Sequence, residues 1–245
     1  MQGEYYKEYS PALGRDMEWK VYGYGGRPVL YIPCQNGRFY DFENYQMLPV
    51  WEPWINSGQV TVFTPDSLDA ETWSNEGGDP GWRIWRHEQW ITHLTEELVP
   101  RMKERTGALF VIAAGCSLGA AHAANLYFRR PDLFDGLLAL SGVYTAEFSF
   151  GSFMNPLVYQ NSPVHYLRDL SPDDPRIHDY NLKRAVFCTG QGPWECPDYT
   201  RTLDQILAEK QIHARFDYWG YDVCHAWPWW YKQTQYFLPW ILQQN

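Results

Sequence analysis

The chain has 245 residues, of which 45% are hydrophobic, so it can bury one sizeable α/β core and nothing in it requires a second domain. Its formal net charge of −9 argues against a nucleic acid or an anionic membrane surface as a partner. No apolar run reaches the roughly 18 residues of a membrane span, and we expect no secretory signal because the first twenty residues lack an apolar segment. Five cysteines without metal-ligand spacing predict free thiols in a cytoplasmic protein that holds neither a metal nor another cofactor.

Short apolar runs alternate with helical periodicity along the chain. Strands are predicted, in chain order, at 17–22, 29–33, 59–66, 108–114, 136–144, 185–190 and 213–220. Helices are predicted at 39–57, broken by Pro49 and Pro53, and at 82–106, 119–130, 199–211 and 227–242. This alternation predicts an α/β fold with a mostly parallel central sheet and helices on both faces. The proline-bearing, poorly periodic segment 145–184 predicts a small cap within a single domain spanning 1–245.

A glycine-serine cluster lies where the apolar strand 108–114 gives way to a helical pattern. Gly115, Cys116, Ser117, Leu118 and Gly119 match G-x-S-x-G in the strand-to-helix context that a nucleophile elbow needs. Glycines on either side let strand and helix approach closely while the serine adopts a strained backbone conformation. The helix N-terminus beneath the serine favours developing negative charge. A serine that merely caps a turn is the alternative, but the context favours a nucleophile.

A serine nucleophile needs a base and a carboxylate that orients it. Of seven histidines, His225 follows the last predicted strand, and catalytic groups of open α/β sheets gather at the carboxyl ends of strands. The loop after strand 185–190 offers two carboxylates, Glu195 and Asp198. Asp198 lies near the start of the next helix, where an aspartate commonly serves as an N-cap, whereas Glu195 has no such structural explanation. Glu195 is therefore the preferred acid and Asp198 the alternative.

Four segments carry a family resemblance that covers nearly the whole chain: RPVLYIPCQNGRFYDFE, EELVPRM, GCSLGAAHAAN and GYDVCHAWPWW. The chain resembles α/β-hydrolases of the putative-esterase group, which includes esterase D and enterochelin-esterase-like enzymes. The order serine, acid, histidine agrees with that fold, although the HGGG oxyanion motif of lipases is absent. The resemblance implies that the Leu118 amide supplies one oxyanion donor. It also implies that the loop 33–37 supplies the second donor, with Gln35 preferred over Asn36, and it places an acidic residue at the Glu195 position.

The expected function is a serine carboxylesterase that acts on a small-molecule ester through an acyl-enzyme. Aromatic residues make up 18% of the chain, and Trp73 and Trp227 are expected to line a pocket for short or aromatic acyl groups, although simple core filling is an equal alternative for any one ring. Acyl transfer to an alcohol through the same acyl-enzyme is one alternative function. A non-catalytic, aromatic-rich binding protein on a hydrolase scaffold is another. The sequence carries no signal for the oligomeric state.

Overall fold

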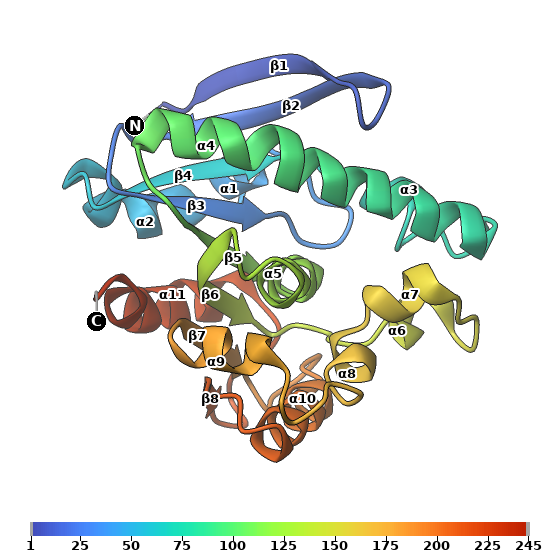
Figure 1. The fold of residues 1–245 in the computed structure, drawn as a ribbon. Coiled ribbons are helices and arrows are strands. Elements are labelled where there is room, and N and C mark those ends of the chain that lie inside the picture. The colour runs from blue at the N-terminus through green and yellow to red at the C-terminus, as the bar shows by residue number, and fades with distance from the viewer. Residues whose placement is uncertain (1, 244–245) are drawn as a thin grey trace.

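The computed structural model describes residues 2–243, in which one eight-stranded sheet runs through the molecule (Figure 1). The strands are β1 (Glu4–Ser10), β2 (Arg15–Tyr22), β3 (Arg27–Ile32), β4 (Val60–Pro65), β5 (Val111–Cys116), β6 (Phe134–Leu140), β7 (Arg184–Thr189) and β8 (Arg215–Tyr218). Their order is β1-β2-β4-β3-β5-β6-β7-β8, and β2 alone runs against the others in this part of the chain. The mostly parallel sheet expected from the alternation of strands and helices is therefore confirmed.

Helices cover both faces of the sheet, as expected. They are α1 (Asp41–Asn44), α2 (Met47–Asn56), α3 (Pro80–Thr92), α4 (Val99–Thr106), α5 (Leu118–Arg129), α6 (Glu147–Phe150), α7 (Pro156–Gln160), α8 (Pro163–Tyr166), α9 (Pro175–Asn181), α10 (Pro197–Glu209) and α11 (Trp227–Leu242). A 3₁₀ turn, η1 (Asp69–Glu71), and a π-helical turn, η2 (His93–Leu98), complete the set.

The side chains of β5 show why the sheet is buried on both faces. Val111 and Ala113 pack into the core formed with α3, α4, α5 and α10, whereas Ile112 and Ala114 pack into the core formed with α2 and α11. Successive side chains of a strand point to opposite faces, so a strand between two helical layers must be apolar throughout. Figure 1 shows α5 and α11 beside the strands that they cover.

Strand β1 was not predicted from the sequence. Its residues, EYYKEYS, alternate between exposed and partly buried positions at the edge of the sheet, where the strand pairs only with β2. An edge strand that buries little apolar surface carries a weak sequence signal. Strand β5 also begins at Val111 rather than at residue 108, and the preceding Leu109 is 78% exposed.

The segment 145–184 is more regular than predicted, because it contains the short helices α6 to α9. Three of them begin with Pro156, Pro163 and Pro175, and proline fits the first turn of a helix because no amide is needed there. Helices of four to seven residues are too short to show an apolar period in sequence. Its role as a cap, and the single domain spanning 1–245, stay predictions.

The predicted helix 82–106 consists of three consecutive pieces, α3, η2 and α4. Pro100 lies in the first turn of α4 and has no amide to donate to the preceding turn. The π-helical turn lies directly before that proline, and π turns are a common way for a helix to absorb a local disruption of its hydrogen bonds.

Candidate active site

Ser117 lies at the turn between β5 and α5, where it is the N-cap residue of the helix. Its backbone adopts φ 56° and ψ −130°, a strained conformation for a residue with a side chain. A Cβ added to Gly115 would lie 2.5 Å from the Gly119 backbone, and a Cβ on Gly119 would lie 2.4 Å from the carbonyl oxygen of Ile32. Both glycines of the motif are therefore required by close backbone approaches.

Three side chains that are far apart in the sequence meet at this turn. The Nε2 atom of His225 lies 2.9 Å from the Ser117 hydroxyl, and its Nδ1 atom lies 3.2 Å from Oε2 of Glu195. Because a carboxylate can only accept, Nδ1 carries the proton and Nε2 is left to accept from the serine. Strands β5 and β7 and the loop after β8 bring these residues to the carboxyl edge of the sheet.

The Glu195 carboxylate is almost completely buried, with 1% of its side chain exposed. Its Oε1 accepts from the Ser141 hydroxyl at 2.7 Å and from the Gly190 amide at 3.3 Å. Its Oε2 lies 3.3 Å from the Thr189 hydroxyl, whose one proton is shared with the Gly190 carbonyl at 3.1 Å. Burial raises the pKa of this carboxyl, but the hydrogen bonds from His225 and Ser141 outweigh burial, so the pKa lies below its ordinary value. The carboxylate is thus held ionised beside the imidazole.

Ser141 and Trp230 were not singled out from the sequence. The Trp230 indole donates to the Ser141 hydroxyl at 3.0 Å, and its ring meets the His225 ring edge-on with centroids 4.9 Å apart. Ser141 itself has a positive φ of 55°, which is uncommon for a residue other than glycine. The available sequence signal was a polar residue directly after an apolar strand, in LLALSG, but that pattern is common.

Asp198 does not reach His225. Its side chain is 91% exposed and pairs with Arg201 at 2.8 Å. The N-cap role expected for it is also wrong, because Cys196 is the N-cap of α10 and Pro197 begins the helix. The proline shifts the start of the helix and leaves Asp198 in its first turn, where a negative charge is favourable.

The turn after β3 lies against the N-terminus of α5. The Cys34 thiol donates to the Cys116 carbonyl at 3.3 Å, and the Gly37 amide closes a tight turn on the Cys34 carbonyl at 2.9 Å. The Asn36 amide donates to Oδ2 of Asp69 at 2.5 Å. Among residues 2–243, neither the Gln35 amide nor the Leu118 amide has a hydrogen-bond acceptor.

The two tryptophans expected in a substrate pocket differ in their surroundings. Trp73 is buried in a cluster with Leu118 and Phe150, beside the elbow. Trp227 lies flat against Tyr45, with ring centroids 4.8 Å apart. Trp73 thus belongs to the apolar packing around Leu118, while Trp227 lies at the start of α11.

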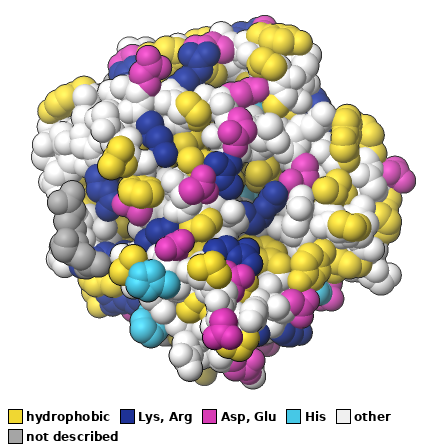
Figure 2. All heavy atoms as spheres, in the orientation of Figure 1, with side chains coloured by type: hydrophobic (Ala, Val, Ile, Leu, Met, Phe, Trp, Pro, Cys, Tyr) yellow, Lys and Arg dark blue, Asp and Glu magenta, His cyan; other side chains and the backbone are white. Residues whose placement is uncertain are grey.

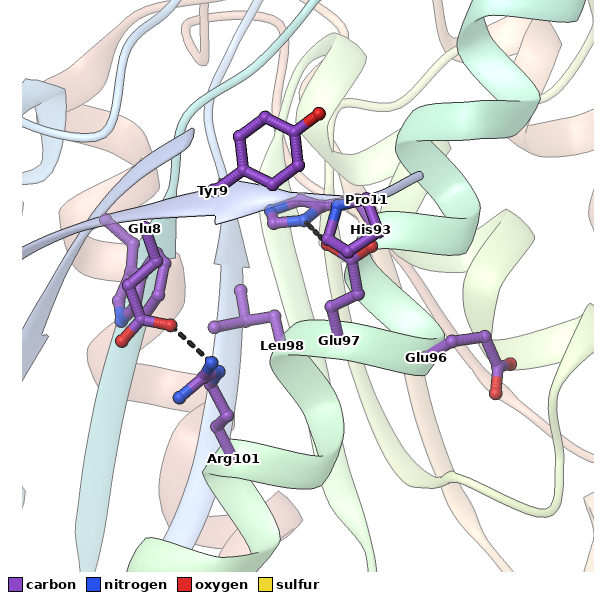
Figure 3. A pocket seen from close by; sticks show the side chains of 9 residues that line it. Glu8, Tyr9, Pro11, His93, Glu96, Glu97, Leu98 and Arg101 are labelled. Carbon is purple, nitrogen blue, oxygen red and sulfur yellow. Dashed lines mark hydrogen bonds and ion pairs between the residues drawn. The ribbon is translucent and has the colours of Figure 1, made fainter. Parts of the chain in front are cut away.

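A separate cavity of about 330 Å³ lies between β1, β2 and the helix segment 93–101 (Figure 3). Four of its charged groups are paired with one another, Glu8 with Arg101 at 2.5 Å and His93 with Glu97 at 2.6 Å, and the fifth, Glu96, pairs with Arg130 outside the cavity. Because these pairs already satisfy the charges and Ser117 is not in its lining, this cavity does not extend the candidate site.

The remaining features bear on metals, membranes and surface charge. Within residues 2–243, no three His, Cys, Asp or Glu side chains are grouped so that they could hold a metal ion. No helix in that range is long and apolar enough to cross a membrane. On the face drawn in Figure 2, basic and acidic side chains lie interspersed.

The chain matches a known protein family over most of its length. A family model described as "Putative esterase" matches residues 10–238. This chain belongs to that esterase family. The resemblance inferred from the four sequence segments is confirmed, and the esterase is a carboxylic ester hydrolase.

Solved structures share the fold of this esterase at low sequence identity. A ferulic acid esterase is 18% identical with a TM-score of 0.78, and the match covers 98% of this chain and 97% of that one. S-formylglutathione hydrolase from Agrobacterium tumefaciens is 13% identical with a TM-score of 0.73, and the match covers 97% and 93%. A ferulic acid esterase from the anaerobic fungus Anaeromyces mucronatus is 13% identical with a TM-score of 0.72, over 99% and 90%. A search of curated protein sequences finds no match to this chain.

Proposed function

We propose that the esterase hydrolyses esters through a covalent acyl-enzyme, with Ser117 as nucleophile, His225 as general base and Glu195 as the orienting carboxylate. One observation carries the proposal. A continuous line of hydrogen bonds runs from the Ser117 hydroxyl through both ring nitrogens of His225 to Glu195, at the N-terminus of α5. This is the arrangement that activates a serine in hydrolases of unrelated folds.

The reaction follows from the position of the protons. His225 Nε2 takes the hydroxyl proton as the Ser117 oxygen attacks the ester carbonyl, and the resulting imidazolium is stabilised by the Glu195 charge. The imidazolium then gives its proton to the departing alcohol as the ester C–O bond breaks. Water, deprotonated by the same imidazole, attacks the acyl-enzyme and releases the acid and the free serine.

The amides of Leu118 and Gln35 are proposed to stabilise the oxyanion. Leu118 is the first residue of α5, where amides have no partner within the helix and the helix dipole favours negative charge. Gln35 is preferred over Asn36 because the Asn36 amide already donates to Asp69. Removal of one such donor costs about 3 kcal/mol of transition-state stabilisation in other hydrolases.

The nucleophile is tested by substitution and by covalent labelling. A fluorophosphonate should label Ser117, and Ser117→Ala should abolish both labelling and ester hydrolysis while the circular dichroism spectrum is unchanged. Hydrolysis at the wild-type rate by the alanine variant would remove the assignment.

The acid is tested by a matched pair of amide substitutions. Glu195→Gln should lower kcat by orders of magnitude, since the amide can no longer stabilise the imidazolium, whereas Asp198→Asn should leave kcat unchanged because that side chain is exposed and paired with Arg201. The reverse outcome would assign the role to Asp198.

The proposed substrates are esters with short-chain or aromatic acyl groups. Support comes from the packing of Trp73 and Phe150 beside Leu118 and from the ferulic acid esterases among the structures of the same fold. Nitrophenyl esters of increasing acyl length, assayed beside methyl ferulate, test this class. A fall in kcat/KM with chain length is expected, and a preference for long acyl chains would contradict it.

Other expectations stay predictions. A transesterified product formed in the presence of an alcohol would favour the acyl-transfer alternative over hydrolysis. The non-catalytic alternative is disfavoured by the family membership and by the three side chains within hydrogen-bonding distance. The cytoplasmic location and the absence of nucleic-acid and membrane partners also stay predictions.

A further inference from the structure

A buried carboxylate lies behind the turn that carries Gln35. Asp69 belongs to η1, after β4, and only 5% of the residue is exposed. Its Oδ2 atom accepts from the Asn36 amide at 2.5 Å and from the Ser74 hydroxyl at 2.7 Å. The Ser74 hydroxyl in turn accepts from the Gln35 side-chain amide at 2.9 Å. Asp69 thus contacts the turn at two residues. It binds the Asn36 amide directly, and it contacts the Gln35 side chain through the Ser74 hydroxyl.

The turn at residues 34–37 needs contacts from outside itself to stay in its observed conformation. Asn36 has a positive φ of 55°, which is uncommon outside glycine. A Cβ on Gly37 would lie 2.8 Å from the Cys34 carbonyl oxygen, so the chain reverses tightly at this point. Four residues with one internal hydrogen bond, from the Gly37 amide to the Cys34 carbonyl, can adopt other conformations unless a neighbouring group selects one.

The loop that carries Asp69 is itself fixed in place. The buried guanidinium of Arg83 donates to the carbonyls of Thr72 and Trp73, at 2.7 and 2.9 Å, and to the Ser149 carbonyl at 2.9 Å. The Ser74 amide also donates to the Asp69 carbonyl at 3.0 Å. The loop that carries the carboxylate is therefore fixed by hydrogen bonds to Arg83 of α3, which also binds the segment after β6.

The location of Asp69 is costly for a carboxylate. Burial raises its pKa above the ordinary value, although the hydrogen bonds from Asn36 and Ser74 oppose the rise. Its second oxygen, Oδ1, is buried without a partner among the described residues. Buried polar groups that are not fully satisfied lower stability, which favours a role in function over one in stability.

We propose that Asp69 is a positioning residue for the oxyanion hole. Its carboxylate binds the Asn36 amide and thereby holds the turn in the one conformation that presents the Gln35 amide beside Leu118. This inference rests on the proposed function, because it assigns the Gln35 amide to the oxyanion. Asp69 itself forms no hydrogen bond with Ser117, His225 or Glu195.

The test compares three variants. Asp69→Ala removes the acceptor, and kcat should fall by about tenfold to a hundredfold with KM nearly unchanged, since loss of a whole oxyanion donor costs 10²–10³ in kcat elsewhere. Asp69→Asn keeps an oxygen that can accept from the Asn36 amide, so kcat should stay within about threefold of the wild type. Ser74→Ala is the control: it removes the other donor to the same oxygen and the contact to the Gln35 side chain but keeps the hydrogen bond from the Asn36 amide to Asp69, so kcat should stay within about threefold of the wild type.

Two further readouts separate positioning from general damage. The inhibition constant of a trifluoromethyl ketone, which forms a tetrahedral adduct, should rise in Asp69→Ala in proportion to the fall in kcat/KM. Hydrogen exchange of the Asn36 amide should be slow in the wild type and in Asp69→Asn and fast in Asp69→Ala. Asp69→Ser, whose side chain is too short to reach the turn, replaces the alanine variant if that variant does not fold, and the same results are expected.

Equal kcat in wild type and Asp69→Ala would overturn the proposal while leaving the proposed function intact, provided that Ser117→Ala is inactive. A loss of activity through KM alone, or an equal loss in Asp69→Asn and Asp69→Ala, would also overturn it. Full activity of Ser117→Ala would instead overturn the proposed function, and the exchange rate of the Asn36 amide would still report whether Asp69 holds the turn.

Discussion

The hydroxyl of Ser141 offers a sharp test of how the buried acid is held. Ser141 donates to Oε1 of Glu195 at 2.7 Å, whereas the Thr189 hydroxyl lies 3.3 Å from Oε2 of the same carboxylate and shares its one proton with the Gly190 carbonyl at 3.1 Å. Ser141→Ala removes the short hydrogen bond, and Thr189→Val removes the long one with almost no change in shape. Comparing kcat of the two variants therefore shows how the length of a hydrogen bond to the Glu195 carboxylate affects the rate.

The expected magnitude follows from the charge of the acceptor. A hydrogen bond to a charged group contributes roughly 1.5–3 kcal/mol, and each 1.36 kcal/mol in the barrier is a factor of ten in rate. Ser141→Ala should thus lower kcat about tenfold to a hundredfold, because the carboxylate loses its closest donor and its pKa rises toward the ordinary value. Thr189→Val should lower kcat by less than about fivefold, since a 3.3 Å contact is weak.

The assay is steady-state hydrolysis of a nitrophenyl ester, with thermal denaturation of each variant as the control for folding. Loss of the Ser141 hydroxyl also leaves the buried Trp230 indole without its acceptor, so some stability should be lost as well. A kcat for Ser141→Ala within twofold of the wild type would refute the reasoning. So would a larger loss in Thr189→Val than in Ser141→Ala.

Two further predictions concern the fold. Gly119→Ala should destabilise the protein by about 1–3 kcal/mol, because the new Cβ would lie 2.4 Å from the Ile32 carbonyl oxygen, whereas Gly77→Ala, with nothing within 4 Å, should not lower the melting temperature. His87 and His122 are buried, and burial lowers the pKa of His87 to about 3 and that of His122 well below its ordinary value. The unfolded chain takes up these protons below about pH 6.5 while the folded chain does not, so stability should fall as the pH drops from 6.5 toward 4, by at most about 1.4 kcal/mol per pH unit for each histidine. An unchanged urea midpoint between pH 7 and pH 5 would contradict this.

The local sequence was sufficient to identify the elbow and the base as candidates. Ser117 lies between two glycines at a strand-to-helix transition, and backbone crowding at such a turn is a local property that glycine alone relieves. His225 could be selected because parallel strands all end at the same edge of the sheet. The α/β architecture was predictable for the same reason, since buried strands and amphipathic helices differ in period.

The sequence left the choice between Glu195 and Asp198 partly open. The argument that Asp198 is the N-cap of the next helix was wrong, because Cys196 takes that position. Glu195, in the loop after β7, and Asp198, in the first turn of α10, are three residues apart, and nothing in the local sequence shows which of them turns inward. The structure separates them by burial: Glu195 is 1% exposed and lies against Ser141, whereas Asp198 is 91% exposed. Burial depends on what other strands bring to the same place, and here the donor comes from the end of β6, 54 residues away.

The family resemblance favoured Gln35 over Asn36, but only the tertiary structure supplied a physical reason for the choice. Both lie in the turn that the family resemblance indicated, and both have a backbone amide that any residue there would have. The difference arises because Asp69, 33 residues further along the chain, accepts from the Asn36 amide. Backbone amides are chemically alike at every position, so which of them stays available to a ligand is determined by contacts between distant segments, and those contacts exist only after folding.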